Sequence, residues 1–126
     1  MADLVTTLFA KEISCNASSS VSFTRGLRGT LQSDGTYALS SIGDIGQIVA
    51  NTPTPAAGGA FVGVALNASY KVPAVVAAGI TASVGDSAWS AASGTFSNVQ
   101  NTSGVLMGVW SQIAAAGGVG EIVISA

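Results

Sequence analysis

The sequence offers few side chains for chemistry. It contains no histidine and one cysteine, Cys15. Triads and metal sites built on histidine are therefore excluded, and Cys15 has no histidine to act as its base. The aspartates Asp34, Asp44 and Asp86 each stand next to a glycine, a pairing typical of tight turns. We expect no catalytic residue, no cofactor and no metal.

The one basic cluster is Arg25-Gly26-Leu27-Arg28-Gly29. Two arginines this close can contact an acidic partner surface or a phosphate, but so small a number favours a solvated turn. Arg25 and Arg28 are nevertheless the candidate partner contacts. The small number of basic residues and the net charge of −2 argue against nucleic acid, which normally requires a basic patch.

Charged residues make up only 8% of the chain, whereas ordinary soluble domains contain about 25%. Low charge suits a protein whose surface is covered by neighbouring subunits, because stable interfaces are depleted of charge. The best apolar run, residues 56–66, is shorter than the roughly 20 residues that a membrane-spanning helix needs, so no membrane partner is expected. The start, Met1-Ala2-Asp3, lacks the pattern of a secretory signal, and we expect synthesis in the cytoplasm.

Glycine spacing and short alternating apolar runs predict an all-β fold, a small barrel or a sandwich-like domain with short turns. Strands are expected within residues 20–42, on either side of a turn at residues 33–36, and again at residues 72–80 and 119–124. Pro73 makes residues 72–80 a candidate edge strand. Only residues 110–116 favour a helix, of two turns at most.

Residues 20–126 are predicted to form a single domain containing two similar units, at about 43–66 and 85–110. Each unit has a Gly-Asp pair followed by a Gly-Val pair, and the Gly-Asp pairs start at Gly43 and Gly85. Residues 1–19 form either an arm or a first strand. Four apolar side chains near the start are candidate contacts of an arm with a neighbouring chain: Leu4, Val5, Leu8 and Phe9.

The second half resembles a known family. A strand leads to Gly85-Asp86-x-x-Trp89, then to Gly94-x-Phe96, to residues 104–109 (Gly-Val-Leu-Met-Gly-Val) and to a final Val/Ile strand. This order and spacing resembles the bacteriophage capsid cement, or decoration, proteins. With Gly43-Asp44 and residues 63–66, the resemblance covers roughly residues 40–126.

The resemblance implies a non-enzymatic virion protein on the capsid surface, commonly a homo-trimer, that clamps neighbouring major capsid subunits against internal genome pressure. It implies no small-molecule substrate and no catalytic residues. A head-fibre base or a carbohydrate- or cell-surface-binding module is the alternative. For a sugar platform the candidates are Trp89, Phe96 and Trp110, although core packing is the more common use of such residues.

Overall fold

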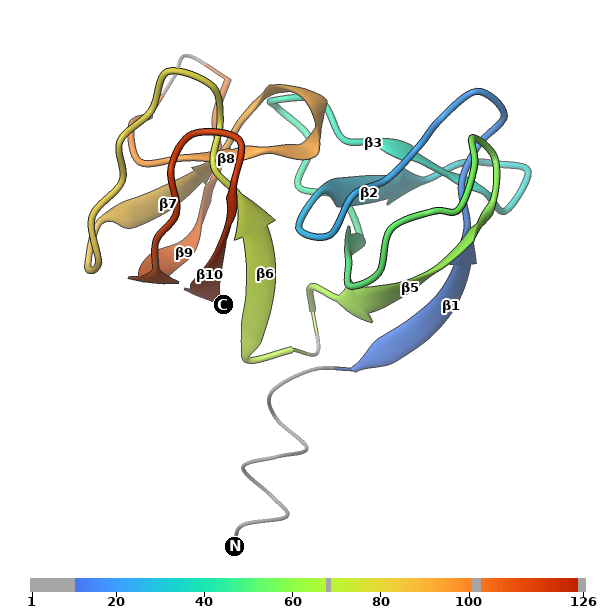
Figure 1. Ribbon diagram of the computed structural model, residues 1–126, viewed down its shortest axis with the longest axis horizontal. Coiled ribbons are helices and arrows are strands. Elements are labelled where there is room, and N and C mark those ends of the chain that lie inside the picture. Colours follow the sequence, from blue (N-terminus) through green and yellow to red (C-terminus); the bar gives the residue numbers. More distant parts are fainter. Residues whose placement is uncertain (1–10, 68, 101–102, 125–126) are drawn as a thin grey trace, which may run out of the picture.

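The structure is a computed structural model that describes residues 11–67, 69–100 and 103–124. It contains two five-stranded antiparallel sheets, which form two adjoining lobes (Figure 1). The first sheet has the order β1-β5-β4-β2-β3 and consists of β1 (Glu12–Asn16), β2 (Arg28–Leu31), β3 (Tyr37–Leu39), β4 (Ile48–Ala50) and β5 (Ala60–Ala65). The second has the order β6-β10-β9-β7-β8 and consists of β6 (Lys71–Val75), β7 (Ser87–Ser90), β8 (Phe96–Ser97), β9 (Leu106–Gln112) and β10 (Val119–Ile124). The all-β, sandwich-like prediction is confirmed.

The two sheets have the same topology. We call β1–β5 (residues 12–65) the first unit and β6–β10 (residues 71–124) the second unit. Glu12 pairs with Val64, and Lys71 pairs with Val123, a shift of 59 in both residue numbers. The isolated parallel bridge of Ala17 with Tyr37 recurs, with the same shift in numbering, as Val76 with Phe96. The second unit therefore repeats the first with a constant period, except that β9 carries a register irregularity against both of its neighbours.

The backbone turns repeat with the same period. Positive φ angles occur at five described positions of the first unit. Four of them recur at the equivalent positions of the second, in the pairs Ser20/Gly79, Gly26/Gly85, Gly35/Gly94 and Gly58/Gly117, whereas Gly46 has no such counterpart. Residues that carry a side chain rarely adopt positive φ angles, and glycine accordingly fills seven of these eight positions. The shared turns fix where each strand begins, and this explains why two sequences with little identity fold alike.

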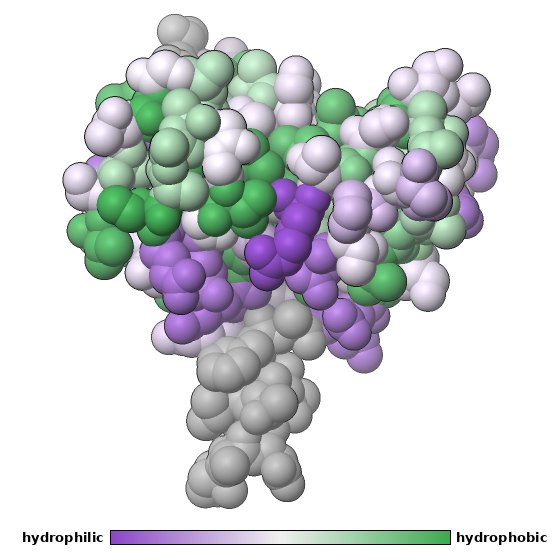
Figure 2. Space-filling model, viewed as in Figure 1, coloured by the Kyte–Doolittle hydropathy of each residue, from purple (hydrophilic) through white to green (hydrophobic). Residues whose placement is uncertain are grey.

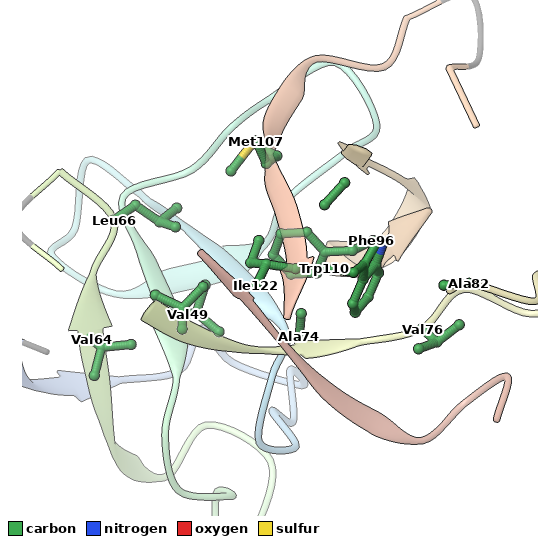
Figure 3. Packing of buried hydrophobic residues seen from close by; sticks show 12 residues of the cluster. Val49, Val64, Leu66, Ala74, Val76, Ala82, Phe96, Met107, Trp110 and Ile122 are labelled. Atoms are coloured by element: carbon green, nitrogen blue, oxygen red, sulfur yellow. The ribbon is translucent and has the colours of Figure 1, made fainter. Parts of the chain in front are cut away.

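Each unit has its own apolar core. The first contains Cys15, Ala17, Phe23, Ile48, Ala50 and Phe61, and the rings of Phe23 and Phe61 stack at 4.5 Å. The second is built around Phe96, Trp110 and Ile122 (Figure 3). It also takes in Val49 and Val64 from the first unit and Leu66 directly after it, so this second core joins the two sheets.

Several predicted elements are found and others are not. The turn at residues 33–36 has Gly35 at φ 86°, and β10 covers residues 119–124 as predicted. Of the candidate edge strand at residues 72–80, residues 72–75 belong to β6, which lies at the edge of the second sheet, and the strand ends there. Residues 110–112, expected to start a helix, instead end strand β9, because pairing with β7 and β10 outweighs the weak local helix preference. Residues 12–16, which lie in the region left open as arm or strand, form β1 and pair with β5.

The two sequence units at 43–66 and 85–110 do not coincide with the structural units. The first of them holds β4 and β5, whereas the second holds β7, β8 and most of β9. Gly43 and Gly85 are not at equivalent positions of the repeat, because Gly85 corresponds to Gly26.

Candidate functional site

The side chain of Arg28 is fully buried between the two units. It starts on β2 of the first unit, and its Nη2 donates hydrogen bonds to the carbonyl oxygens of Ala91 at 2.5 Å and Thr95 at 3.3 Å in the second unit. Its Nη1 donates to the carbonyl oxygen of Asp44. The guanidinium also lies 5.4 Å from the centre of the Phe96 ring, within the range of cation–π attraction. Arg28 therefore fastens one unit to the other.

Burial lowers the pKa of Arg28 to about 10, and the nearby charge of Asp44 opposes this shift. The side chain still carries its charge at neutral pH. A buried guanidinium has to be compensated by hydrogen bonds, and the surrounding backbone carbonyls supply them. Because Arg28 has no exposed surface, its prediction as a partner contact is corrected: the charge is used inside the molecule.

Arg25 is exposed and belongs to a polar groove between the units. The groove encloses about 170 Å³, and four of its lining residues are polar: Arg25, Asn51, Lys71 and Glu121. Arg25 Nε donates to Asn51 Oδ1 at 3.4 Å, and Lys71 Nζ lies 3.5 Å from Glu121 Oε1. Figure 2 shows hydrophilic residues grouped between the two lobes. Of the two predicted arginines, Arg25 alone is available to a partner.

A second groove is apolar. It encloses about 370 Å³ and is lined mainly by Ile45, Leu66, Leu106, Met107 and Ile124, which come from both units. Two of these side chains are well exposed, Ile45 at 44% and Leu106 at 47%. Figure 2 also shows hydrophobic residues at the surface of the lobe formed by β6–β10. Exposed apolar patches of this kind commonly mark interaction surfaces.

The aspartates make the predicted turn hydrogen bonds. Asp34 Oδ1 accepts from the backbone N–H and the hydroxyl of Thr36, at 3.0 and 2.6 Å, and these bonds lower the pKa of Asp34. Asp86 Oδ2 accepts from Asn98 Nδ2 at 3.1 Å and from the Ser83 N–H at 2.9 Å, and the pKa of Asp86 is lowered for this reason.

Asp44 also serves a turn, since its Oδ1 accepts from the Gly46 N–H at 3.0 Å and its Oδ2 from the Thr30 hydroxyl at 2.9 Å. Cys15 lies buried in the first core, and desolvation raises the pKa of its thiol. These are the side chains best suited to chemistry by residue type. The aspartates are used in hydrogen bonds that support turns, and Cys15 is used in core packing.

Of the three candidates for a sugar platform, Trp89 is half-buried and the other two pack inside the fold. Phe96 and Trp110 have no exposed surface, and their rings meet edge to face at 6.4 Å. They therefore lie in the core rather than on a sugar platform.

The predicted arm contacts Leu4, Val5, Leu8 and Phe9 lie outside the described residues. Within the part of the chain that the structure describes, no group of three or more His, Cys, Asp or Glu side chains could hold a metal ion. Over the same residues, no helix is long and apolar enough to cross a membrane.

No protein-family model matches this chain, and the search of curated proteins found no match. Among solved structures, the chain is similar to the head fibre gp8.5 N base in bacteriophage phi29. The two chains share 19% sequence identity, the match covers 91% of this chain and 95% of that chain, and the TM-score is 0.67. At this identity the likeness shows a shared fold.

The likeness to the head fibre base extends over both units. A match to 91% of the chain is too long for either unit alone. The phi29 protein therefore shares the arrangement of the two sheets, and not merely the fold of one of them. The sequence signal for this arrangement was Ala56-Ala57-Gly58-Gly59, which recurs at the equivalent positions of the second unit as Ala115-Ala116-Gly117-Gly118.

Proposed function

We propose that this chain is a structural protein of a bacteriophage head, bound to the outside of the capsid. The observation that supports it best is the likeness over nearly the full length to a head fibre base. The pattern of glycines and small apolar residues that resembles the cement proteins points to the same place on the particle. A fold match at low identity does not transfer a function by itself, so the proposal rests on the agreement of these two observations.

The proposed role is mechanical, with the major capsid protein as partner and no chemical reaction. The aspartates with turn bonds, the buried Cys15 and the buried Arg28 all serve the fold. The surface left for a partner is poor in charge and includes the apolar groove around Leu106 and Met107. Such a surface suits a permanent contact in an assembly.

Two finer roles fit this position. A cement protein clamps neighbouring capsid subunits and raises the stability of the head, as the sequence resemblance implies. A head-fibre base, the part of a fibre to which the similar phi29 chain belongs, would join a fibre to the head and need not stabilise the capsid. Both roles require direct attachment to the head, and they differ in what attachment does to the capsid.

The test uses DNA-filled heads from a phage in which the gene for this chain has been deleted. Purified chain is added, the heads are sedimented, and bound chain is quantified. We expect saturable binding, and the absence of binding would overturn the proposed function. The temperature of DNA release then separates the finer roles: a cement raises it at saturation, whereas a fibre base leaves it unchanged.

We also propose that the predicted arm contributes to attachment through Leu4, Val5, Leu8 and Phe9. The deletion should stop at residue 10, because the carbonyl oxygen of Lys11 accepts the Ala65 N–H at 2.8 Å and so belongs to the sheet. Removing residues 2–10 should leave a folded protein that dissociates from heads more readily on heating. Unchanged release from heads would show that the arm does not contact them.

A further inference from the structure

The segment that precedes β1 joins the fold beside the apolar groove. The start of β1 lies next to the end of β5 (Figure 1). At this point the carbonyl oxygen of Lys11 accepts the Ala65 N–H at 2.8 Å, and the Lys11 N–H donates to Ser69 Oγ at 3.1 Å. Leu66, which directly follows Ala65, lines the groove. The ten residues before Lys11 are therefore attached at the edge of the groove.

The groove is suited to an apolar occupant. Its walls include Ile45 from the first unit and Leu106 from the second, which are 44% and 47% exposed. None of the described residues that line it is charged. Its volume of about 370 Å³ lies within the range of about 300–1,000 Å³ that is usual for ligand pockets. A charged ligand would find no ionic partner among these walls, whereas apolar side chains would cover exposed apolar surface.

The second unit shows where the segment before a first strand goes. Tyr70 is equivalent to Lys11, because the Ile124 N–H donates to the Tyr70 carbonyl oxygen at 2.9 Å just as the Ala65 N–H donates to Lys11. Leu66 lies four residues before Tyr70, is 6% exposed and belongs to the second core. In the second unit, the segment that leads into the first strand therefore packs an apolar side chain against the fold.

The arm has the composition and the length to cover the groove. It carries four apolar side chains, Leu4, Val5, Leu8 and Phe9. A chain spans at most about 3.3–3.6 Å per residue, so the reach from Lys11 is about 7 Å for Phe9 and about 23–25 Å for Leu4. The apolar side chains can therefore be laid along a groove that begins one residue beyond the anchor.

We propose that the arm, residues 1–10, docks in the apolar groove of its own chain. The occupant is the chain's own arm because the bonds of Lys11 hold it at the groove, which gives it a high effective concentration there, whereas any other occupant has to be bound from solution. The contact covers two apolar surfaces at once. It thereby limits unwanted association of a chain in which only 8% of the residues are charged.

The docking is reversible. Burial of apolar side chains favours it, and the loss of backbone entropy in the ordered arm opposes it. In the proposed function, the same side chains contact the head, so attachment exchanges the groove for the capsid and uncovers the groove as a contact surface. This exchange rests on the proposed function, whereas the docking in the isolated chain does not.

The first test measures how fast chymotrypsin cuts the arm of the isolated full-length chain. Leu106→Asp places a charge in the groove, and Val84→Asp is the matched control, because Val84 is 64% exposed and is not among the lining residues. Circular dichroism first establishes that both variants fold. Cleavage after Leu4 and Leu8, followed by mass spectrometry, should be about tenfold faster in Leu106→Asp than in the wild type. The control should be cut at the wild-type rate. Equal rates in the wild type and Leu106→Asp would overturn the proposal.

A second test identifies the site and the chain that supplies the arm. On a Cys15→Ala background, Leu4→Cys or Leu8→Cys is combined with Leu106→Cys, and the control combines the same arm cysteine with Val84→Cys. A disulfide requires Cα atoms within about 7 Å. Mild oxidation of dilute protein should therefore link the arm to the groove within one chain, faster than in the control, as seen by non-reducing electrophoresis. Links between chains would assign the arm to another copy's groove, and no preference over the control would place the arm elsewhere. Either result refutes docking within the chain. Neither test involves heads, so both leave the proposed function to its own test.

Discussion

The guanidinium of Arg28 lies over the ring of Phe96, 5.4 Å from its centre. Arg28 belongs to the first unit and Phe96 to the core of the second. Since Nη2 of Arg28 also reaches the carbonyl oxygens of Ala91 and Thr95, this one side chain makes both hydrogen bonds and a cation–π contact with the second unit. We therefore expect the arrangement of the two units to depend strongly on this residue.

Replacing Arg28 with methionine should destabilise the protein by about 2–4 kcal/mol, because several buried carbonyl oxygens lose their donor. Arg25→Met is the matched control. Arg25 is exposed and makes one long hydrogen bond to Asn51, so its replacement should change stability by no more than about 0.5 kcal/mol. Urea unfolding measures both values. Equal stability of the two variants would show that Arg28 does not hold the units together.

The glycine pair Gly26 and Gly85 offers a test of the internal interface. Both have positive φ, so alanine at either position should cost about 1–2 kcal/mol in backbone strain. Gly26→Ala adds a clash with the backbone of β6, where the new Cβ would lie 2.9 Å from the Val75 nitrogen, whereas Gly85 has open space. In thermal unfolding of the isolated monomer, Gly26→Ala should therefore melt at a clearly lower temperature than Gly85→Ala. The reverse order would contradict the described packing of β6.

Asp86 should contribute to the dependence of stability on pH. Hydrogen bonds from Asn98 and Ser83 lower its pKa from the ordinary 3.8. The folded state therefore favours the ionised form. Its contribution is fully present above pH 3.8 and is lost as the pH falls through the lower folded-state pKa. Asp86→Asn should flatten the loss of stability in this acidic range relative to the wild type. Parallel stability curves between pH 5 and pH 2 would mean that Asp86 makes no such contribution.

Cys15 should react slowly with thiol reagents in the native protein. The side chain is 3% exposed, and burial raises the pKa of its thiol, which leaves little reactive thiolate. Labelling with a disulfide reagent should therefore be limited by the rate at which the first core opens, and it should become fast in denaturant. Labelling of the native protein as fast as that of the unfolded chain would place Cys15 outside the first core.

Local features of the fold were predictable from the sequence. The Asp34-Gly35 turn and the β-branched strand at residues 119–124 depend on nearby residues, and both are found as expected. Pro53 and Pro55 also marked a loop correctly. The aspartate roles followed for the same reason, because a turn hydrogen bond spans two or three residues.

The structural repeat was harder to see. Its two units share few identical residues, chiefly Gly26/Gly85, Gly35/Gly94 and the Ala-Ala-Gly-Gly segment. The more conspicuous Gly-Asp pairs have a different spacing and concealed the true period. The burial of Arg28 was not predictable either, since the carbonyl groups that receive it come from residues far along the chain, in the other unit.

The central claim, that the chain is a structural protein of the phage head, is tested most directly by locating it on intact particles. Phage whose genome encodes the chain is labelled with gold-coupled antibodies against the purified protein and viewed by electron microscopy, with particles from a deletion strain as control. The account predicts gold over the heads of wild-type particles and none on the deletion strain. Wild-type heads without label, or label confined to the tails, would contradict it.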